Sequence, residues 1–509
     1  MKASGSWIAL LLGLLAIGTQ AATLPVREHV LDNGMRLLIM EDHTAPVVMG
    51  AWVAHVGSVN ERPGITGLTH LLEHMMFKGT RTIGTRDIAT DLELIERQEA
   101  LRDSMRALDE VYRARVRRGE ASSLAEAREN DPLQAGLAQR FAELVAEQRE
   151  NMISNEFDQI MKKNGEIFGN AFTSEDMTAY FHVLPSNKLE LWFWLESDRL
   201  GNPVFREFYS ERDVVREERR SRVESTPTGA HQEAINALFW QALPYKWPVI
   251  GFASDVEQLS MPQAREYFDT WYGPGNLTAI ITGDVDTEAA IALADRYFGR
   301  LRPRPDPPMM VTTEPVQLGE KRYAADVDGN TTLEVWYHTP GFGHADQPVL
   351  RVIGSLLSGT TGRLERELVQ DTGIATQVSA FADAQKYAGV FYAELEAAEG
   401  HDLDELESHL FAALDKLARE PVPDQELQKV KNNWLVNDYR QRQDPIRGAF
   451  GLIQNDGLGD WRQFFEFGDA LQAVSAADIQ RVAAEIFRKE NRMVVRWSRR
   501  ESTVTAAAE

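Results

Sequence analysis

The most informative segment of this sequence is Gly64-Ile-Thr-Gly-Leu-Thr-His70-Leu-Leu-Glu73-His74-Met-Met-Phe77. Its apolar residues recur with the spacing of one helix face, which predicts an α-helix anchored in a core. His70 and His74 are four residues apart, so a helix stacks both imidazoles on a different face, within reach of one cation. The segment therefore predicts a buried helix that presents a metal site.

Hydrolysis by a zinc-activated water is the chemistry that this helix suggests. Zinc lowers the pKa of a bound water to about 7, and a nearby carboxylate can take up the proton that the water releases. Glu73 lies beside the two histidines and is the candidate general base. Catalytic zinc sites usually have three protein ligands and keep one position for water, so a third ligand must come from elsewhere in the chain.

A charged helical pattern further along the chain offers that ligand. In Glu211-Arg-Asp-Val-Val-Arg-Glu217-Glu218-Arg219, Glu211 and Glu218 are seven residues apart and fall on nearly the same helix face. Glu217 points about a quarter-turn away. A charged helix of this kind is more often simply solvated. Its pairing with the histidine motif is what makes it a candidate.

The pattern His70-Leu-Leu-Glu-His74 is that of the inverzincins, and its surroundings resemble the pitrilysin and insulinase family of zinc metallopeptidases. The matching residues are Gly57-Ser58, Asn60-Glu61, Gly67-Leu68 and Met76-Phe-Lys-Gly-Thr80. The resemblance implies an endopeptidase with one Zn²⁺ per chain, in which Glu218 is the third ligand and Glu211 supports the site.

The same resemblance extends downstream to a stretch that matches the family's substrate-binding edge strand. Its residues are Asn170, Ala171, Phe172 and Thr173. A peptide substrate is then expected to pair with this strand through main-chain hydrogen bonds. The resemblance thus covers essentially the whole mature chain, with short or unfolded peptides as the expected substrates.

Two stretches of the chain look like copies of one another. Leu259-Ser-Met-Pro262 opens a helical pattern leading to Asn276, and Val474-Ser-Ala-Ala477 opens one leading to Asn491, 215 residues later. A period of this length indicates a duplicated domain. β-like runs alternate with amphipathic helical patterns, which predicts an α+β fold of two homologous domains, each a mixed sheet covered by helices. By the resemblance, the domains form a clamshell like that of the mitochondrial processing peptidases.

The expected organisation is a signal peptide (1–21), a zinc-binding domain (22–301), a proline-rich linker (302–317), a homologous inactive domain (318–500) and a tail (501–509). From about 92 to 163 the chain is rich in Glu, Arg, Ala and Leu, with breaks near Gly119 and Asp131-Pro132. This pattern predicts a helical hairpin inserted into the first domain. The hairpin is either a docking arm or lid, or an exposed decoration.

Composition narrows the setting of the protein. The formal charge of −23 disfavours nucleic acid as a partner. The absence of cysteine excludes disulfides and thiolate ligands. The apolar run Trp7–Ile17 is too short for a membrane span and is typical of a secretion signal, and no span is expected in the mature chain. We therefore expect export across the inner membrane to a bacterial periplasm.

One departure from the family bears on activity. Members that work alone carry an arginine and, seven residues later, a tyrosine that bind substrate and stabilise the oxyanion, and these positions align here with Val369 and Thr376. Neither side chain can replace the lost donors. We therefore expect a homologous companion subunit to supply them in a heterodimer. The alternatives are a non-catalytic peptide-binding or assembly subunit, and a metal sensor or store.

Overall fold

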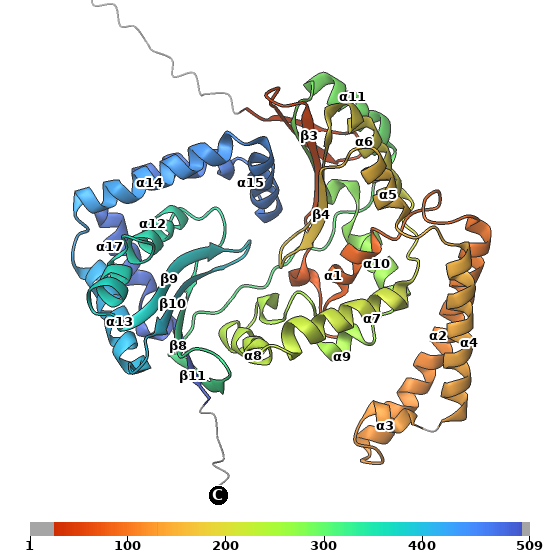
Figure 1. The fold of residues 1–509 in the computed structure, drawn as a ribbon, viewed down its shortest axis with the longest axis horizontal. Helices are drawn as coiled ribbons and strands as arrows, with labels where there is room; N and C mark the ends of the chain where they lie inside the picture. The colour runs from red at the N-terminus through yellow and green to blue at the C-terminus, as the bar shows by residue number, and fades with distance from the viewer. Residues whose placement is uncertain (1–24, 130, 501–509) are drawn as a thin grey trace, which may run out of the picture.

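The computed structural model describes residues 25–129 and 131–500, so the predicted signal peptide and tail lie outside the described residues. Figure 1 shows two halves that lie side by side, with a long helical hairpin projecting from the first half away from the second. Across the described residues, no helix is both long enough and apolar enough to span a bilayer.

Each half is built around one mixed β-sheet. The first sheet has the order β1-β2-β6-β3-β5-β4, formed by Arg27–Val30, Arg36–Glu41, Leu277–Gly283, Val47–Ala54, Thr178–Pro185 and Phe168–Thr173. The second has the order β7-β11-β8-β10-β9, formed by Lys321–Val327, Arg492–Arg499, Thr332–Thr339, Gly389–Ala397 and Ala375–Ala384. The edge strands are thus β1 and β4 in one sheet, and β7 and β9 in the other.

Helices cover both sheets (Figure 1). Those of the first half are α1 (Leu68–Met75), α6 (Leu189–Gly201), α7 (Phe208–Arg219), α8 (Gly229–Phe239), α9 (Ala253–Val256), α10 (Met261–Trp271) and α11 (Thr287–Tyr297). Those of the second half are α12 (Gln347–Leu357), α13 (Leu403–Arg419), α14 (Asp424–Arg442), α15 (Pro445–Leu458), α16 (Gln463–Ala473) and α17 (Ala476–Ile486). Within the described part of the chain, π-helical segments occur at Arg220–Glu224 and Glu365–Asp371.

The two sheets are copies of one topology. Without β1, the first order reads β2-β6-β3-β5-β4, and each position has a counterpart in β7-β11-β8-β10-β9, including the single parallel pair, β2 with β6 and β7 with β11. Asn276 and Asn491 also make equivalent hydrogen bonds. Each side chain donates to the last residue of the preceding helix, at Trp271 O and Ile486 O. The predicted α+β fold of two homologous domains is confirmed.

The halves are joined by more than the chain connection. Helix α15 belongs to the second half but packs on β3 and β6 of the first sheet. Its buried Ala449, Leu452 and Ile453 share a core with strand residues such as Leu38 and Met49. The face of the first sheet opposite α6 and α10 is therefore covered by the second half, which fixes the two halves against each other.

The hairpin consists of α2 (Ile88–Arg117), α3 (Leu124–Arg128) and α4 (Pro132–Asn151), followed by α5 (Glu156–Lys163). At its base, the side chains of Asp91 and Arg206 form a fully buried ion pair. Near its tip, Tyr112, Ala121 and Ala127 form a small core of their own. The predicted insertion is thus a helical arm held at its base and, further along, by contacts of Glu99, Arg106 and Phe141 with Tyr209 of α7.

Candidate metal centre

Helix α1 carries the histidine motif and is held by its apolar face. Leu68, Leu71, Leu72 and Met75 are at most 1% exposed. The helix starts after Gly67, whose φ of 86° suits glycine, and a Cβ there would lie 2.6 Å from Ile250 O. The sequence therefore determines both the position of the helix and the side that it turns toward α7 and β4.

Three predicted ligands lie together. His70 and His74 point their Nε2 atoms at Glu218 Oε2 from α7, at 3.8 and 3.6 Å. The three candidate ligand atoms lie within 4.8 Å of one another. Helices α1 and α7 are thus in contact although their residues are far apart in the chain.

The donor set fits zinc. Tetrahedral ligands at about 2.0–2.1 Å from zinc lie about 3.4 Å apart, so the distances of 3.8 and 3.6 Å from Glu218 to the histidines need only a small contraction. Burial, with the charges of His74 and Arg222, lowers the pKa of His70 to about 3, which keeps this imidazole neutral and able to bind a cation. The Nδ1 atom of His70 is buried and has no hydrogen-bond partner among the described residues.

Glu211 contacts His74 but is not one of the three candidate ligands. Its Oε2 is 3.4 Å from His74 Nδ1, and its Oε1 binds the ammonium of Lys78. Burial alone would raise the pKa of Glu211, but the hydrogen bonds from His74 and Lys78 hold it below the usual range. A carboxylate in this position fixes the orientation of the imidazole and increases its basicity.

Glu73 has a partner that the sequence did not suggest. Thr173, expected only as a substrate-binding residue, donates its hydroxyl to Glu73 Oε2 at 2.6 Å. Burial raises the pKa of Glu73 above the usual range, although this hydrogen bond opposes the shift. A carboxylate with a raised pKa is suited to accept and return a proton near neutral pH.

The other predicted substrate-binding residues lie on β4, beside the ligand cluster. Among the described strands, β4 pairs only with β5, so its other edge is open to a peptide. Asn170 is exposed, Ala171 is buried and Phe172 is half-buried. The side chain of Asn170 accepts the N–H of Ala171 at 2.9 Å, so an incoming strand would displace this contact.

Lys78 and Arg222 also lie at the site and were not singled out from the sequence. Lys78 is one helical turn beyond His74, and Arg222 is four residues beyond Glu218, where its Nη1 lies 2.7 Å from Glu218 Oε1. The same i,i+4 spacing that marked the histidines could have found both. Glu217 is exposed and pairs with Arg220, away from the cluster.

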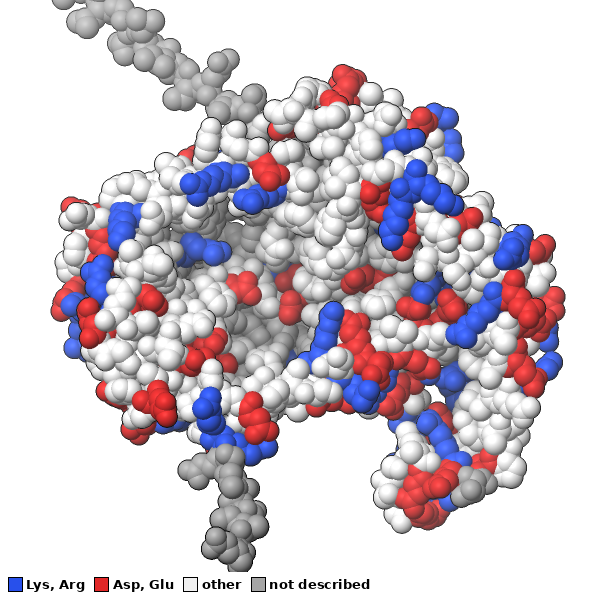
Figure 2. Space-filling model, viewed as in Figure 1, with Lys and Arg blue, Asp and Glu red and all other residues white. Residues whose placement is uncertain are grey.

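A hollow separates the two halves, and acidic atoms line part of it (Figure 2). One cavity there has a volume of about 340 Å³ and is walled from both halves, by Glu175, Trp240 and Tyr245 on one side and Phe381, Asp383 and Tyr392 on the other. Glu175 follows Thr173 by two residues. The cavity is therefore near the C-terminal end of β4.

Val369 and Thr376 lie in the second half, in the π-helical segment Glu365–Asp371 and on β9. The turn after β9 contacts the first half, where Lys386 N donates to Asp176 Oδ2 at 3.0 Å. Thr376 is at the opposite end of β9, and a strand of that length spans roughly 30 Å. Its hydroxyl donates to Glu396 instead.

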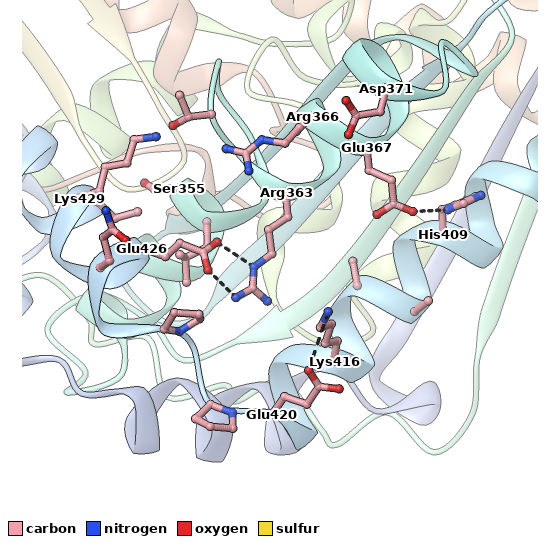
Figure 3. Close-up of a pocket in the computed structure, with 18 residues that line it drawn as sticks. Ser355, Arg363, Arg366, Glu367, Asp371, His409, Lys416, Glu420, Glu426 and Lys429 are labelled. Atoms are coloured by element: carbon pink, nitrogen blue, oxygen red, sulfur yellow. Dashed lines mark hydrogen bonds and ion pairs between the residues drawn. The ribbon is translucent and has the colours of Figure 1, made fainter.

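Figure 3 shows a larger cavity, of about 1080 Å³, in the second half. Its lining comes from α12 to α14 and the π-helical segment Glu365–Asp371. Several of its charges are paired with each other, as Arg363 is with Glu426 and His409 with Glu367. It contains none of the predicted site residues.

Comparisons with known proteins point to one family. The family model described as insulinase (peptidase family M16) matches residues 36–99 and 126–251, and that described as peptidase M16 inactive domain matches 258–434. The stretch 100–125 that the first model leaves out lies in the helical hairpin. Together the matches cover most of both halves.

Similar proteins are named as proteases. Zinc protease PqqE of Helicobacter pylori is 29% identical over 370 residues, 70% of this chain and 81% of that protein. The uncharacterized zinc protease YmxG of Bacillus subtilis is 21% identical over 481 residues, 91% of this chain and 96% of that protein.

Solved structures share the fold. A protease from Helicobacter pylori matches with a TM-score of 0.74 at 23% identity, over 93% of this chain and 100% of that chain. The periplasmic protease PqqL of Escherichia coli matches with a TM-score of 0.69 at 16% identity, over 95% of this chain but only 49% of that chain. The present fold therefore corresponds to about half of the longer protein.

Proposed function

Because this chain belongs to the insulinase family, peptidase family M16, we propose that it is a zinc-dependent endopeptidase that hydrolyses peptides or unfolded polypeptides. The observation that carries the proposal is the convergence of His70, His74 and Glu218, with the carboxylate of Glu73 beside them. A metal store needs the three ligands but has no use for a fourth, proton-accepting group next to them.

In this proposal His70, His74 and Glu218 hold one Zn²⁺, and Glu211 orients His74 through its Nδ1 atom. The ion would supply Lewis acidity and lower the pKa of a water at its open position. The low pKa of His70 supports its part, since a ligand imidazole must be neutral to bind a metal.

Glu73 is the proposed general base. Its carboxylate accepts a proton from the attacking water and returns it to the nitrogen of the leaving amine as the peptide bond breaks. The hydroxyl of Thr173 holds one oxygen of Glu73 and leaves the other free for the water. Because Thr173 ends β4, the base is fixed relative to a peptide that pairs with the open edge of this strand.

A homologous companion subunit completes the proposed active site. Val369 and Thr376 lack the donors found in family members that act alone. An arginine and tyrosine must then come from another polypeptide. The Escherichia coli protease, which is about twice as long as this chain, supports a need for a second unit of similar size.

We further propose that the protein acts in the periplasm, after export directed by residues 1–21. The apolar run in these residues supports this location. The Escherichia coli relative is likewise described as a periplasmic protease.

A second candidate function is a non-catalytic peptide-binding or assembly subunit. Two observations favour it: the missing donors at positions 369 and 376, and a structural neighbour from Pseudomonas fluorescens that is described as a peptidase M16 inactive domain. The intact base and ligand set favour the peptidase.

Zinc content and cleavage of an unstructured fluorogenic peptide library separate these functions. The purified chain, Glu73→Gln and the control Glu217→Gln are each measured with and without a co-expressed companion. We expect about one zinc in all three, partner-dependent cleavage by the wild type and the control, and a loss of at least about 100-fold in Glu73→Gln. Bound zinc without cleavage in any combination would contradict the peptidase and favour the second candidate.

A further inference from the structure

Three arginines follow the third ligand, and each has a different environment. Arg219 is buried and donates to Gly251 O and Glu233. Arg220 is exposed and pairs with Glu217 on the outer surface. Arg222 turns the other way and binds Glu218 itself, at 2.7 Å. Only the last of the three contacts a metal ligand.

The backbone explains why Arg222 faces the site. Helix α7 ends at Arg219 and continues as a π-helical segment, Arg220–Glu224. Arg222 is four residues after Glu218, so the two side chains lie on nearly the same side of this continued helix, about one turn apart. π-Helical segments are frequent at functional sites.

The two carboxylate oxygens of Glu218 have different partners. Oε1 forms the ion pair with Arg222, whereas Oε2 faces the Nε2 atoms of His70 and His74. With Oε1 held, the carboxylate can offer only Oε2 to a metal. It would therefore bind through one oxygen and leave space for a water beside the histidines.

The charge of Arg222 and its contact with Glu218 should have opposite effects on the affinity for zinc. A guanidinium near the site repels a second cation, and its field also contributes to the low pKa of His70. Removal of the charge alone should therefore tighten zinc binding. Removal of a group that orients a ligand should weaken zinc binding, typically by about 10- to 100-fold. The sign of the change thus identifies which effect dominates.

We propose that Arg222 is a positioning residue that holds Glu218 as a one-oxygen ligand of the metal. This inference rests on the proposed function. The Arg222 side chain is 72% exposed, so as an ordinary surface ion pair it would alter binding by at most about fivefold. A larger loss of affinity therefore requires the positioning role.

The test is the zinc dissociation constant, measured by competition with a chromogenic chelator. The variants are Arg222→Ala, Arg222→Lys, Glu218→Ala and their combination, with Arg220→Ala as the matched control. We expect Arg222→Ala to weaken zinc binding about 10- to 100-fold, Arg222→Lys to weaken it less, and Arg220→Ala to leave it unchanged. In the Glu218→Ala background, Arg222→Ala should have no further weakening effect, because the two residues act through one contact.

Unfolding of the metal-free variants in urea shows that they are folded, and the visible spectrum of the Co²⁺-substituted proteins reports ligand geometry. Tighter or unchanged binding by Arg222→Ala, a loss of no more than about fivefold, or equal weakening in both backgrounds, would overturn the positioning role. If instead the wild type binds no zinc, or binds it equally after His70→Ala, the proposed function itself fails. The two failures are thus distinguishable.

Discussion

Asp456 joins the two halves, and its replacement by asparagine should loosen them. This residue lies on α15, and its side chain is 0% exposed. Its Oδ1 is 2.6 Å from Arg36 Nη2 on β2, and its Oδ2 is 3.2 Å from His55 Nε2. Asparagine keeps the shape of the side chain but removes the charge that these two groups face.

The expected cost follows from burial. Removal of one partner from a buried ion pair costs about 3–5 kcal/mol. Arg36 is 28% exposed and has Glu28 at 4.0 Å, so it can be partly rehydrated. We therefore expect the free energy of unfolding to fall by about 2–3 kcal/mol. For a unit of about 200 residues this is a decrease in Tm of about 4–12 °C.

The pH dependence has a definite sign. Burial alone would raise the pKa of Asp456, but the hydrogen bond and charge of His55, with the charge of Arg36, hold it below the usual value of 3.8. The ion pair therefore contributes its full stability above that value and loses it as the pH falls through the lower, folded-state pKa. The difference between wild type and Asp456→Asn should be present at about pH 5 and shrink below about pH 4.

Scanning calorimetry measures both effects. Asp460→Asn is the control, since Asp460 is 45% exposed and pairs with the exposed Arg462. This control should change Tm by less than about 3 °C. A change in Asp456→Asn as small as in the control, or a difference that persists undiminished at pH 3, would refute the reasoning.

Three further predictions concern the site and the hairpin. Thr173→Val removes the hydrogen bond to Glu73 and should lower kcat about 10-fold or more without loss of zinc. The peptide assay with the companion subunit measures this change, and Thr173→Ser should retain activity. Glu211→Gln should weaken zinc binding about 10- to 100-fold in chelator competition. A smaller change would contradict a role for Glu211 in supporting the metal ligands. Replacement of 109–136 by a short turn should leave Tm and zinc content nearly unchanged, because the buried base is retained; unfolding of this variant would contradict a self-contained tip.

The sequence by itself determined those features that depend on the local geometry of a single helix or of a helix end. The spacing of His70, Glu73 and His74 within one helix was enough to predict a shared metal site, because residues four apart are neighbours on any α-helix. The matching stretches ending at Asn276 and Asn491 were enough to predict the duplication, since the same residue makes the same helix-ending contact in both halves.

Contacts between distant segments were decided by the tertiary structure alone. Glu218 was chosen over Glu217 by resemblance, and its meeting with the histidines depends on how α7 packs against α1 across an inserted hairpin. The hydrogen bond from Thr173 to Glu73 depends on where β4 ends, and the cover that α15 provides for the first sheet depends on the docking of the halves. Helical periodicity specifies the face on which a residue lies, but not the segment that faces it, because long-range packing is set by the shape of the whole core.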